Sequence, residues 1–133
     1  MRDLDASACF YETVLGFEAG QTRETTIDGK RHRHRHTPLW RGPVTIGLGT
    51  LETLPASHHL RRGGPDAALG LSVEICVYVK DGALEEFHGH VRKTAETHVG
   101  PLAQRPWGVR DFRVVDPDGY YIRITAPDRD FRS

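Results

Sequence analysis

Two stretches of this chain repeat the same landmarks, and this repeat limits the possible folds more than any other feature. Phe10 lies on the apolar face of an expected helix and recurs as Phe87, 77 positions later, in a second expected helix. Gly42, which precedes an expected strand, recurs at the same offset as Gly119. Each half therefore contains one helix followed by three strands. A repeated unit of this kind implies two copies packed around a pseudo-twofold axis.

The first half begins with an expected helix over residues 3–16. Asp3 or Asp5 can cap its first turn, and Gly16 can end it. Apolar residues three and four positions apart give this helix one buried face, formed by Phe10, Tyr11, Val14 and Leu15. Strands are expected at residues 17–25, 31–41 and 43–49, with turn signals at Asp28-Gly29 and at Arg41 to Pro43.

The second half has an additional strand in front of its helix. Residues 71–81 alternate cleanly, and their apolar face consists of Val73, Ile75, Val77 and Val79. A helix is expected over 82–94, then a short strand at 95–99 and a hairpin formed by 109–115 and 120–125. The turn of this hairpin, Asp116 to Gly119, has proline second and glycine fourth, which is typical of a type I turn.

The repeat divides one structural domain into a first module at 1–51, a linker loop at 52–70 and a second module at 71–127. Subtracting 77 from the residue numbers of the leading strand of the second module gives the place of the same strand in the first module, which falls before Met1. Either the given start lies downstream of the true one, or the first sheet keeps an open edge that a partner strand can fill. The first alternative is the favoured expectation.

Composition excludes several classes of function. The 133 residues are enough for one domain, and 18 Lys and Arg residues balance 18 Asp and Glu residues, so no net charge attracts nucleic acid. No apolar run has the length of a membrane span, and the start does not resemble a signal peptide. The two cysteines form no metal-binding pair. The sequence predicts a cytoplasmic protein without nucleic-acid or membrane partners.

Two segments resemble the vicinal oxygen chelate superfamily, which includes glyoxalase I, bleomycin resistance proteins, fosfomycin-resistance enzymes and extradiol dioxygenases. They are "RDLDASACFYETVLGFE" at 2–18 and "PWGVRDFRVVDPDGYYIRI" at 106–124. The resemblance implies an α+β fold of paired βαβββ modules, with most of the leading strand of the first module missing from this chain. It also implies a ligand cleft lined by the sheets, and a homodimer.

Metal enzymes of this superfamily place a histidine in each leading strand and a glutamate in the closing strand. Carried over by position, the second leading-strand ligand falls on Glu74 and the closing-strand ligand on Arg123, whose counterpart at the offset of 77 is Ile46. A guanidinium stays protonated and offers no lone pair to a cation. The resemblance therefore implies that the usual metal ligands are missing here. The pattern is nearest to that of the bleomycin resistance proteins, which bind their ligand without catalysing a reaction.

Strand alternation predicts which side chains face the cleft. Glu74 and Arg123 are expected on one face, where they pair with each other or Arg123 binds an acidic or carbonyl group of a ligand. Trp107 either offers a flat apolar surface to the ligand or anchors its loop. The expected ligand-binding residues are Glu74, Tyr78, Trp107, Arg110, Tyr121 and Arg123.

Histidines provide a second, weaker candidate site. His32, His34 and His36 alternate along one expected strand, and imidazoles two positions apart can share Zn²⁺ or Ni²⁺. An exposed polar strand explains the same pattern without a metal. The residues that remain as metal candidates are Glu74, His34 and His36, and they do not form a complete ligand set.

These features favour a binding protein over an enzyme. The expected function is binding of a small planar or aromatic molecule in a cleft, without a metal or other cofactor, and sequestration of an antibiotic is one form of it. The alternative is a lyase, isomerase or dioxygenase that uses a divalent metal ion to polarise vicinal oxygens of its substrate. A pure interaction module has less support, because no charged face or long apolar stripe is left for a protein partner.

Overall fold

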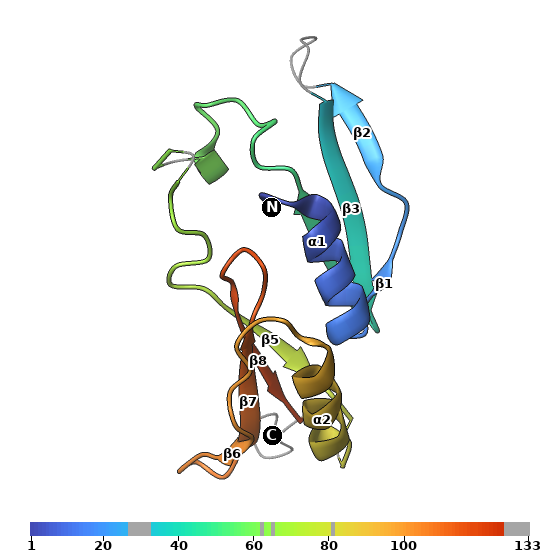
Figure 1. Cartoon of the computed structure of the whole chain (residues 1–133), viewed down its shortest axis with the longest axis vertical. Helices are drawn as coiled ribbons and strands as arrows, with labels where there is room; N and C mark the ends of the chain where they lie inside the picture. The colour runs from blue at the N-terminus through green and yellow to red at the C-terminus, as the bar shows by residue number, and fades with distance from the viewer. Residues whose placement is uncertain (27–32, 62, 65, 81, 127–133) are drawn as a thin grey trace. The chain divides into compact units, whose positions relative to one another are not determined.

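The computed structural model describes residues 1–26, 33–61, 63–64, 66–80 and 82–126. Over these residues the chain is an α+β protein with two four-stranded sheets (Figure 1). Its contacts divide it into unit 1, Met1–Leu69, and unit 2, Gly70–Ser133. The predicted turn at Asp28-Gly29 and the side chain of His32 lie outside the described residues. None of the helices within these ranges has the length and apolar character of a membrane span.

The predicted first helix is confirmed. It consists of α1 (Leu4–Cys9) and a π-helical turn, η1 (Phe10–Val14). The carboxylate of Asp3 caps α1 by accepting a hydrogen bond of 2.9 Å from the backbone N–H of Ala6. Gly16 ends the helical segment at a φ of +73°, a conformation that glycine adopts without a steric penalty. The predicted apolar face is buried: Phe10, Tyr11, Val14 and Leu15.

The sheet of unit 1 consists of β1 (Glu18–Ala19), β2 (Arg23–Thr26), β3 (Arg33–Arg41) and β4 (Val44–Gly49). β3 is central, with β4 along one edge and β1 and β2 in succession along the other, all antiparallel. The single strand predicted at 17–25 is therefore wrong, because it is broken in the middle. Gly20 donates to the carbonyl of Pro38 at 2.9 Å, and Pro38 has no N–H to return a bond to that edge.

β4 pairs with β3 along only one of its edges. At the other edge, the described residues provide no strand, and the contacts there come from the backbone of Met1. Met1 donates to the carbonyl of Gly49, and the N–H of Leu51 donates to the carbonyl of Met1 at 3.0 Å. These two bonds bridge Met1 to the end of β4.

Residues 52–70 connect the two sheets. Among the described residues of this segment, the one regular element is a short 3₁₀ turn, η2 (His59–Arg61). Arg61 holds the segment in place by donating to the carbonyl of Leu54 at 2.6 Å. This agrees with the absence of apolar periodicity in the sequence.

Unit 2 consists of β5 (Glu74–Tyr78), α2 (Leu84–Thr94), β6 (Ala103–Gln104), β7 (Arg110–Val115) and β8 (Tyr121–Thr125). The order in the sheet is β5-β8-β7-β6, and β5 runs parallel to β8 (Figure 1). The predicted strand at 95–99 is wrong, since only Val99 bridges to β7. Gly100 still donates to the carbonyl of Arg113, and pairing resumes at β6, inside a predicted loop, with the register shifted by one residue.

The predicted turn between β7 and β8 is confirmed. Gly119 donates its N–H to the carbonyl of Asp116 at 3.0 Å and has a φ of +96°. The buried Asp116 carboxylate also accepts hydrogen bonds from the N–H groups of Asp118 and Tyr120, at 2.9 and 2.8 Å. The side chain of Asp116 therefore holds the turn at the correct length for the hairpin.

The core of unit 2 lies between its sheet and α2. Aliphatic and aromatic side chains from alternate positions of β7 and β8 meet the apolar stripe of α2. The apolar side chains of this unit without any solvent exposure are Val91, Phe112, Val114, Ile122 and Ile124. The sequence predicted Ile122 and Ile124 on this side, and the structure confirms it.

Candidate functional site

The sheet of unit 2 has two chemically different faces. Phe112 lies against α2, with its ring centroid 4.6 Å from that of His88. Side chains alternate along a strand, so Asp111 and Arg113 point to the opposite face. We call this opposite face the arginine face. Its residues, which the strand register brings together, are Glu74, Cys76, Tyr78, Asp111, Arg113, Val115, Tyr121, Arg123 and Thr125.

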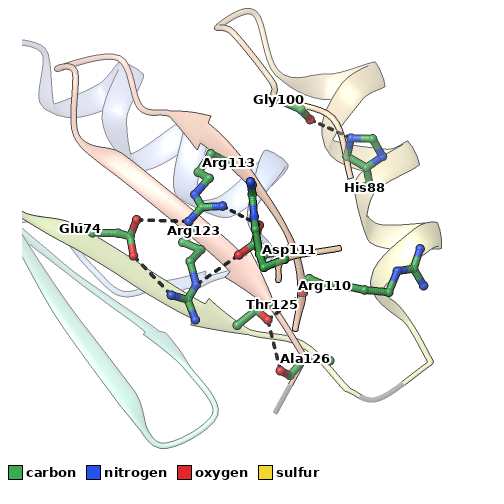
Figure 2. A network of polar contacts seen from close by, with 10 residues as sticks. Glu74, His88, Gly100, Arg110, Asp111, Arg113, Arg123, Thr125 and Ala126 are labelled. Carbon is green, nitrogen blue, oxygen red and sulfur yellow. Dashed lines mark hydrogen bonds and ion pairs between the residues drawn. The ribbon is translucent and has the colours of Figure 1, made fainter. Parts of the chain in front are cut away.

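Asp111 is the buried anion of the arginine face, with no solvent exposure of its side chain. Its Oδ1 accepts a hydrogen bond from Arg105 Nε at 2.8 Å and another from Arg113 Nη1 at 2.5 Å. Figure 2 shows Arg113 and Arg123 converging on this carboxylate. Charge-assisted bonds of this kind are stronger than neutral ones, more so away from water. A single oxygen therefore fixes the positions of two guanidiniums.

Arg123 extends across the same face, as the alternation predicted. Its Nη1 lies 3.7 Å from Glu74 Oε1, and its Nε lies 3.8 Å from Asp111 Oδ2. Both distances allow ion pairs but exceed those of hydrogen bonds. Arg123 Nε and Asp111 Oδ2 are buried and lack a hydrogen-bond partner within the described structure, and such groups typically cost about 1–3 kcal/mol each. The charged side chains therefore lie close together, but two of their buried polar atoms make no hydrogen bond within the described structure.

The charges of this cluster do not cancel. Three guanidiniums, from Arg105, Arg113 and Arg123, meet two carboxylates, from Asp111 and Glu74. Glu74 is the more distant partner, because its oxygens lie 3.7 and 3.9 Å from the nearest guanidinium nitrogens. The face thus carries an excess of positive charge close to its surface.

A cavity of about 290 Å³ opens next to this cluster, within unit 2. It lies between the segment that leads into β6 and the adjoining parts of β7 and β8. The residues that line it are His98, Gly100, Pro101, Ala103, Arg105, Arg113, Val115 and Tyr121. Its volume is near the lower end of the range for small-molecule pockets.

The structure places two of the expected ligand-binding residues close to this cavity. Tyr121 lines it directly. Arg123 lies next to Arg113, its Cα partner across the β7–β8 pair. Glu74 and Tyr78 occupy the arginine face on β5, opposite Tyr121 and Thr125. Glu74 therefore contacts the cluster, while Tyr78 lies at the other end of β5.

Two other expected residues lie elsewhere. Arg110 belongs to the α2 side of the sheet by alternation, and its guanidinium forms an ion pair there with Glu85 of α2. Figure 2 shows Arg110 extending toward α2, away from Asp111. Trp107 is 58% exposed and lies near the tip of the loop between β6 and β7. It is not among the residues that line the cavity.

Three charged residues of the cluster were missed. Asp111 and Arg113 belong to "RDFRVV", where Phe112 and Val114 mark the core side, so extending the alternation to this strand reveals both. Arg105 lies in a loop, where no periodicity indicates a direction. Its backbone bonds to Val109 and Gly108, at 2.8 and 2.9 Å, turn the chain back toward β7.

The arginine face does not fit the divalent metal that the resemblance implies for enzymes. Its carboxylates, on Glu74 and Asp111, are already in ion pairs with guanidiniums, and Arg123 occupies the closing-strand position. Positive charges at these distances repel a cation. No group of three or more His, Cys, Asp and Glu side chains in the described residues is arranged to hold a metal ion.

The two described histidines of β3 lie on the opposite side of their sheet from α1. A Cβ at Gly49 would lie 2.9 Å from the ring of His34, and one at Gly47 would lie 2.5 Å from the ring of His36. The imidazoles therefore occupy space that these glycines of β4 leave open. Nδ1 of His34 is engaged with the hydroxyl of Thr53 at 3.1 Å. His32, the third member of the predicted set, lies outside the described residues.

The offset of 77 misplaces the counterpart of Arg123 by one residue. Ile46 is paired with Leu39, which is fully buried, so Ile46 lies on the core side of the unit 1 sheet. The other side of β4 carries Thr45 and Gly47. Arg41 pairs with Val44 across a turn that is shorter than the one between β7 and β8, and this shifts the face by one position.

No family model matches the sequence, and no curated protein matches it. Solved structures do. A member of the glyoxalase/bleomycin resistance protein/dioxygenase superfamily from Sphaerobacter thermophilus DSM 20745 is similar with a TM-score of 0.63 and 18% identity, covering 96% of this chain and 90% of that one. Lactoylglutathione lyase from Agrobacterium tumefaciens gives a TM-score of 0.61 and 22% identity, covering 94% and 86%.

TnmS3, an antibiotic binding protein from Streptomyces sp. CB03234, gives a TM-score of 0.60 and 16% identity, covering 95% of this chain and 88% of that one. At these identities the likeness concerns the fold. The fold of this chain is therefore that of the glyoxalase/bleomycin resistance proteins, as the sequence predicted, and it accommodates both enzymes and binding proteins.

Proposed function

We propose that this protein binds a small planar or aromatic molecule on the arginine face of unit 2, without a metal ion. A planar antibiotic meets this description, and its sequestration would confer resistance. The observation that carries the proposal is Arg123, which stands at the closing-strand position and lies between Glu74 and Asp111 at 3.7 and 3.8 Å. A guanidinium there binds polar ligand groups and disfavours a cation.

The cavity supports a ligand of modest size. Val115, Pro101 and Tyr121, together with Arg105 and Arg113, line a space of about 290 Å³. Ligand pockets typically combine apolar walls with a few fixed polar groups, as here. TnmS3, which has the same fold, is described as antibiotic binding, and this is the function that we carry over as part of the proposal.

A homodimer in the cytoplasm completes the proposal, as the sequence resemblance implies. Sedimentation equilibrium of the full chain tests the dimer. A mass of one chain at all concentrations would contradict it.

The metal-dependent alternative is a lyase, isomerase or dioxygenase. It is supported by the similarity to lactoylglutathione lyase, but the donors on the arginine face do not suit it. Titration calorimetry of untagged protein with Mn²⁺, Fe²⁺, Ni²⁺ and Zn²⁺, anaerobic for iron, separates the two functions. We expect no tight binding that depends on Glu74. Ni²⁺ or Zn²⁺ can also bind weakly to the histidines of β3. Such binding would remain in Glu74→Ala and disappear in His34→Ala.

Tight one-to-one binding that Glu74→Ala abolishes would contradict the proposal and favour the enzyme. Substrates with vicinal oxygens would then be the next ligands to test. The matched control is Glu85→Ala, because Glu85 is also a glutamate of unit 2 but lies on α2, paired with Arg110. It should leave metal binding unchanged.

A further inference from the structure

We infer that the cavity of unit 2 binds an anionic group of the ligand, a carboxylate, phosphate or phosphonate, between Arg105 and Arg113. This inference rests on the proposed function and specifies the ligand class for the same site. Both arginines line the cavity, and the guanidiniums of both are bonded to one oxygen of Asp111, at 2.8 and 2.5 Å.

The two arginines have hydrogen-bond donors left for a ligand. A guanidinium carries five N–H groups in a planar fork. In the described part of the chain, Arg105 makes one side-chain hydrogen bond, through Nε, so the four N–H groups of its two terminal nitrogens are available. Arg113 is bonded through Nη1, and its Nη2 lies 3.9 Å from Glu74, beyond hydrogen-bond distance. A second oxyanion can accept from these nitrogens without displacing Asp111.

Asp111 orients the arginines without neutralising them. Its side chain is fully buried and bonded to both, so their positions are set before a ligand arrives. Preorganised donors bind more tightly because less side-chain entropy is lost on binding. Three guanidiniums against two carboxylates leave one positive charge, which an anionic ligand group balances.

The remaining walls of the cavity define the rest of the ligand. Tyr121 and Val115 offer apolar surface, and His98 is a further polar residue of the lining. A ring stacked against the phenol of Tyr121 with its acidic group toward Arg113 satisfies both kinds of wall. The expected ligand class is therefore a small aromatic acid rather than a neutral planar molecule.

The experiment uses three probes of the same shape: benzoate, phenylphosphonate and uncharged benzamide. Binding to the full chain is followed by the NMR signals of arginine Nε–H groups and of the amides of Gly100 and Ala103. We expect the two anions to bind and to shift these signals, with benzamide at least tenfold weaker. Raising the salt concentration should weaken the anions and leave benzamide unchanged. The stronger of the two anions identifies the acidic group.

Variants locate the effect. Arg113→Gln and Arg105→Gln should each weaken the anions about tenfold and leave benzamide within twofold. The matched control is Arg110→Gln, on the same strand as Arg113 but on the α2 side, which should leave all three affinities unchanged. Arg105→Lys keeps the charge but lacks the fork, so an intermediate affinity is expected. Amide spectra of each variant check that it is folded.

The outcomes distinguish the inference from the proposed function. If benzamide binds as tightly as benzoate and neither responds to Arg105→Gln or Arg113→Gln, the anion site is refuted while small-molecule binding stands. If Arg110→Gln weakens anion binding as much as Arg113→Gln does, the anions respond to the overall charge of the protein and not to this cavity, and the inference also fails. If no aromatic probe binds at millimolar concentration, the inference and the proposed function both fail.

Discussion

The two closing strands, β4 of unit 1 and β8 of unit 2, begin 77 positions apart but have different surroundings. β8 lies between β7 and β5, whereas β4 has β3 along one edge and, within the described residues, only the backbone of Met1 at the other. β8 carries Arg123 into a charged cluster. β4 carries Gly47 and Gly49, over which the rings of His34 and His36 lie.

This difference shows how one repeated scaffold is used in two ways. In unit 2, two neighbours hold the closing strand, so its side chains form a fixed surface that can be tuned for binding. In unit 1, the corresponding face of β4 carries Gly47 and Gly49 and has no charged cluster among the described residues. Four experiments test this difference between the units.

Asp111→Asn should have the largest effect. It removes the buried negative charge that holds two partly buried guanidiniums, so the free energy of unfolding should fall by about 3 kcal/mol, the lower end of the range for breaking a buried ion pair. Urea denaturation measures this. The unit 1 control is Asp5→Asn, because the Asp5–Arg35 pair is exposed and should contribute only about 0–1 kcal/mol. Equal losses in the two variants would mean that the unit 2 cluster has no special role in stability.

Hydrogen exchange should differ between the two strands. Thr50 donates its N–H to Arg35 of β3, so alternation turns the amides of Thr45 and Gly47 away from β3. We expect these two amides to exchange at least about tenfold faster than those of β8, which is paired on both sides. Comparable protection would show that something covers the free edge of β4 in solution, and a second copy of the chain would be the first candidate.

Aromatic residues of unit 2 should contribute unequally to ligand binding. Tyr121 lines the cavity, while Trp107 is exposed near the tip of its loop. Tyr121→Ala should therefore weaken benzoate about fivefold to tenfold, in line with roughly 1–1.5 kcal/mol for an aromatic contact, and Trp107→Ala should change it less than twofold. NMR titration of both variants measures these affinities. A larger loss in Trp107→Ala than in Tyr121→Ala would mean that the ligand binds at the loop and not in the cavity.

The smallest effect concerns the α2 side of the unit 2 sheet. The hydrogen bond from Arg110 lowers the pKa of the Glu85 carboxyl below its ordinary value of 4.5. A lowered folded-state pKa contributes stability above the unfolded pKa, and this contribution is lost as the pH falls through the folded-state value. Arg110→Gln should therefore slightly lower the melting temperature at pH 7 and have no effect at pH 2. A larger effect at pH 2 would contradict this assignment.

Much of the fold follows from local chemistry. Alternation in β5 and β8 placed Glu74 and Arg123 on one face, and the structure brings them to 3.7 Å. Asp3, one of the two expected caps, caps α1, and the turn at Asp116 was also correct, because both depend on hydrogen bonds within a few residues. The break between β1 and β2 was missed because it arises from Pro38, on a different strand.

Local patterns in the sequence were thus enough to predict the helices and the faces of β5 and β8, since these depend on periods of 3.6 and 2.0 along one segment. The core-side position of Ile46 follows from the fold and not from the local pattern, because the length of the preceding turn sets the register. The fold also decides that Arg105, from a loop, joins Arg113 and Asp111 beside a cavity. Which side chains come together in this way depends on how the strands pair across the sheet. A local pattern in the sequence does not predict it.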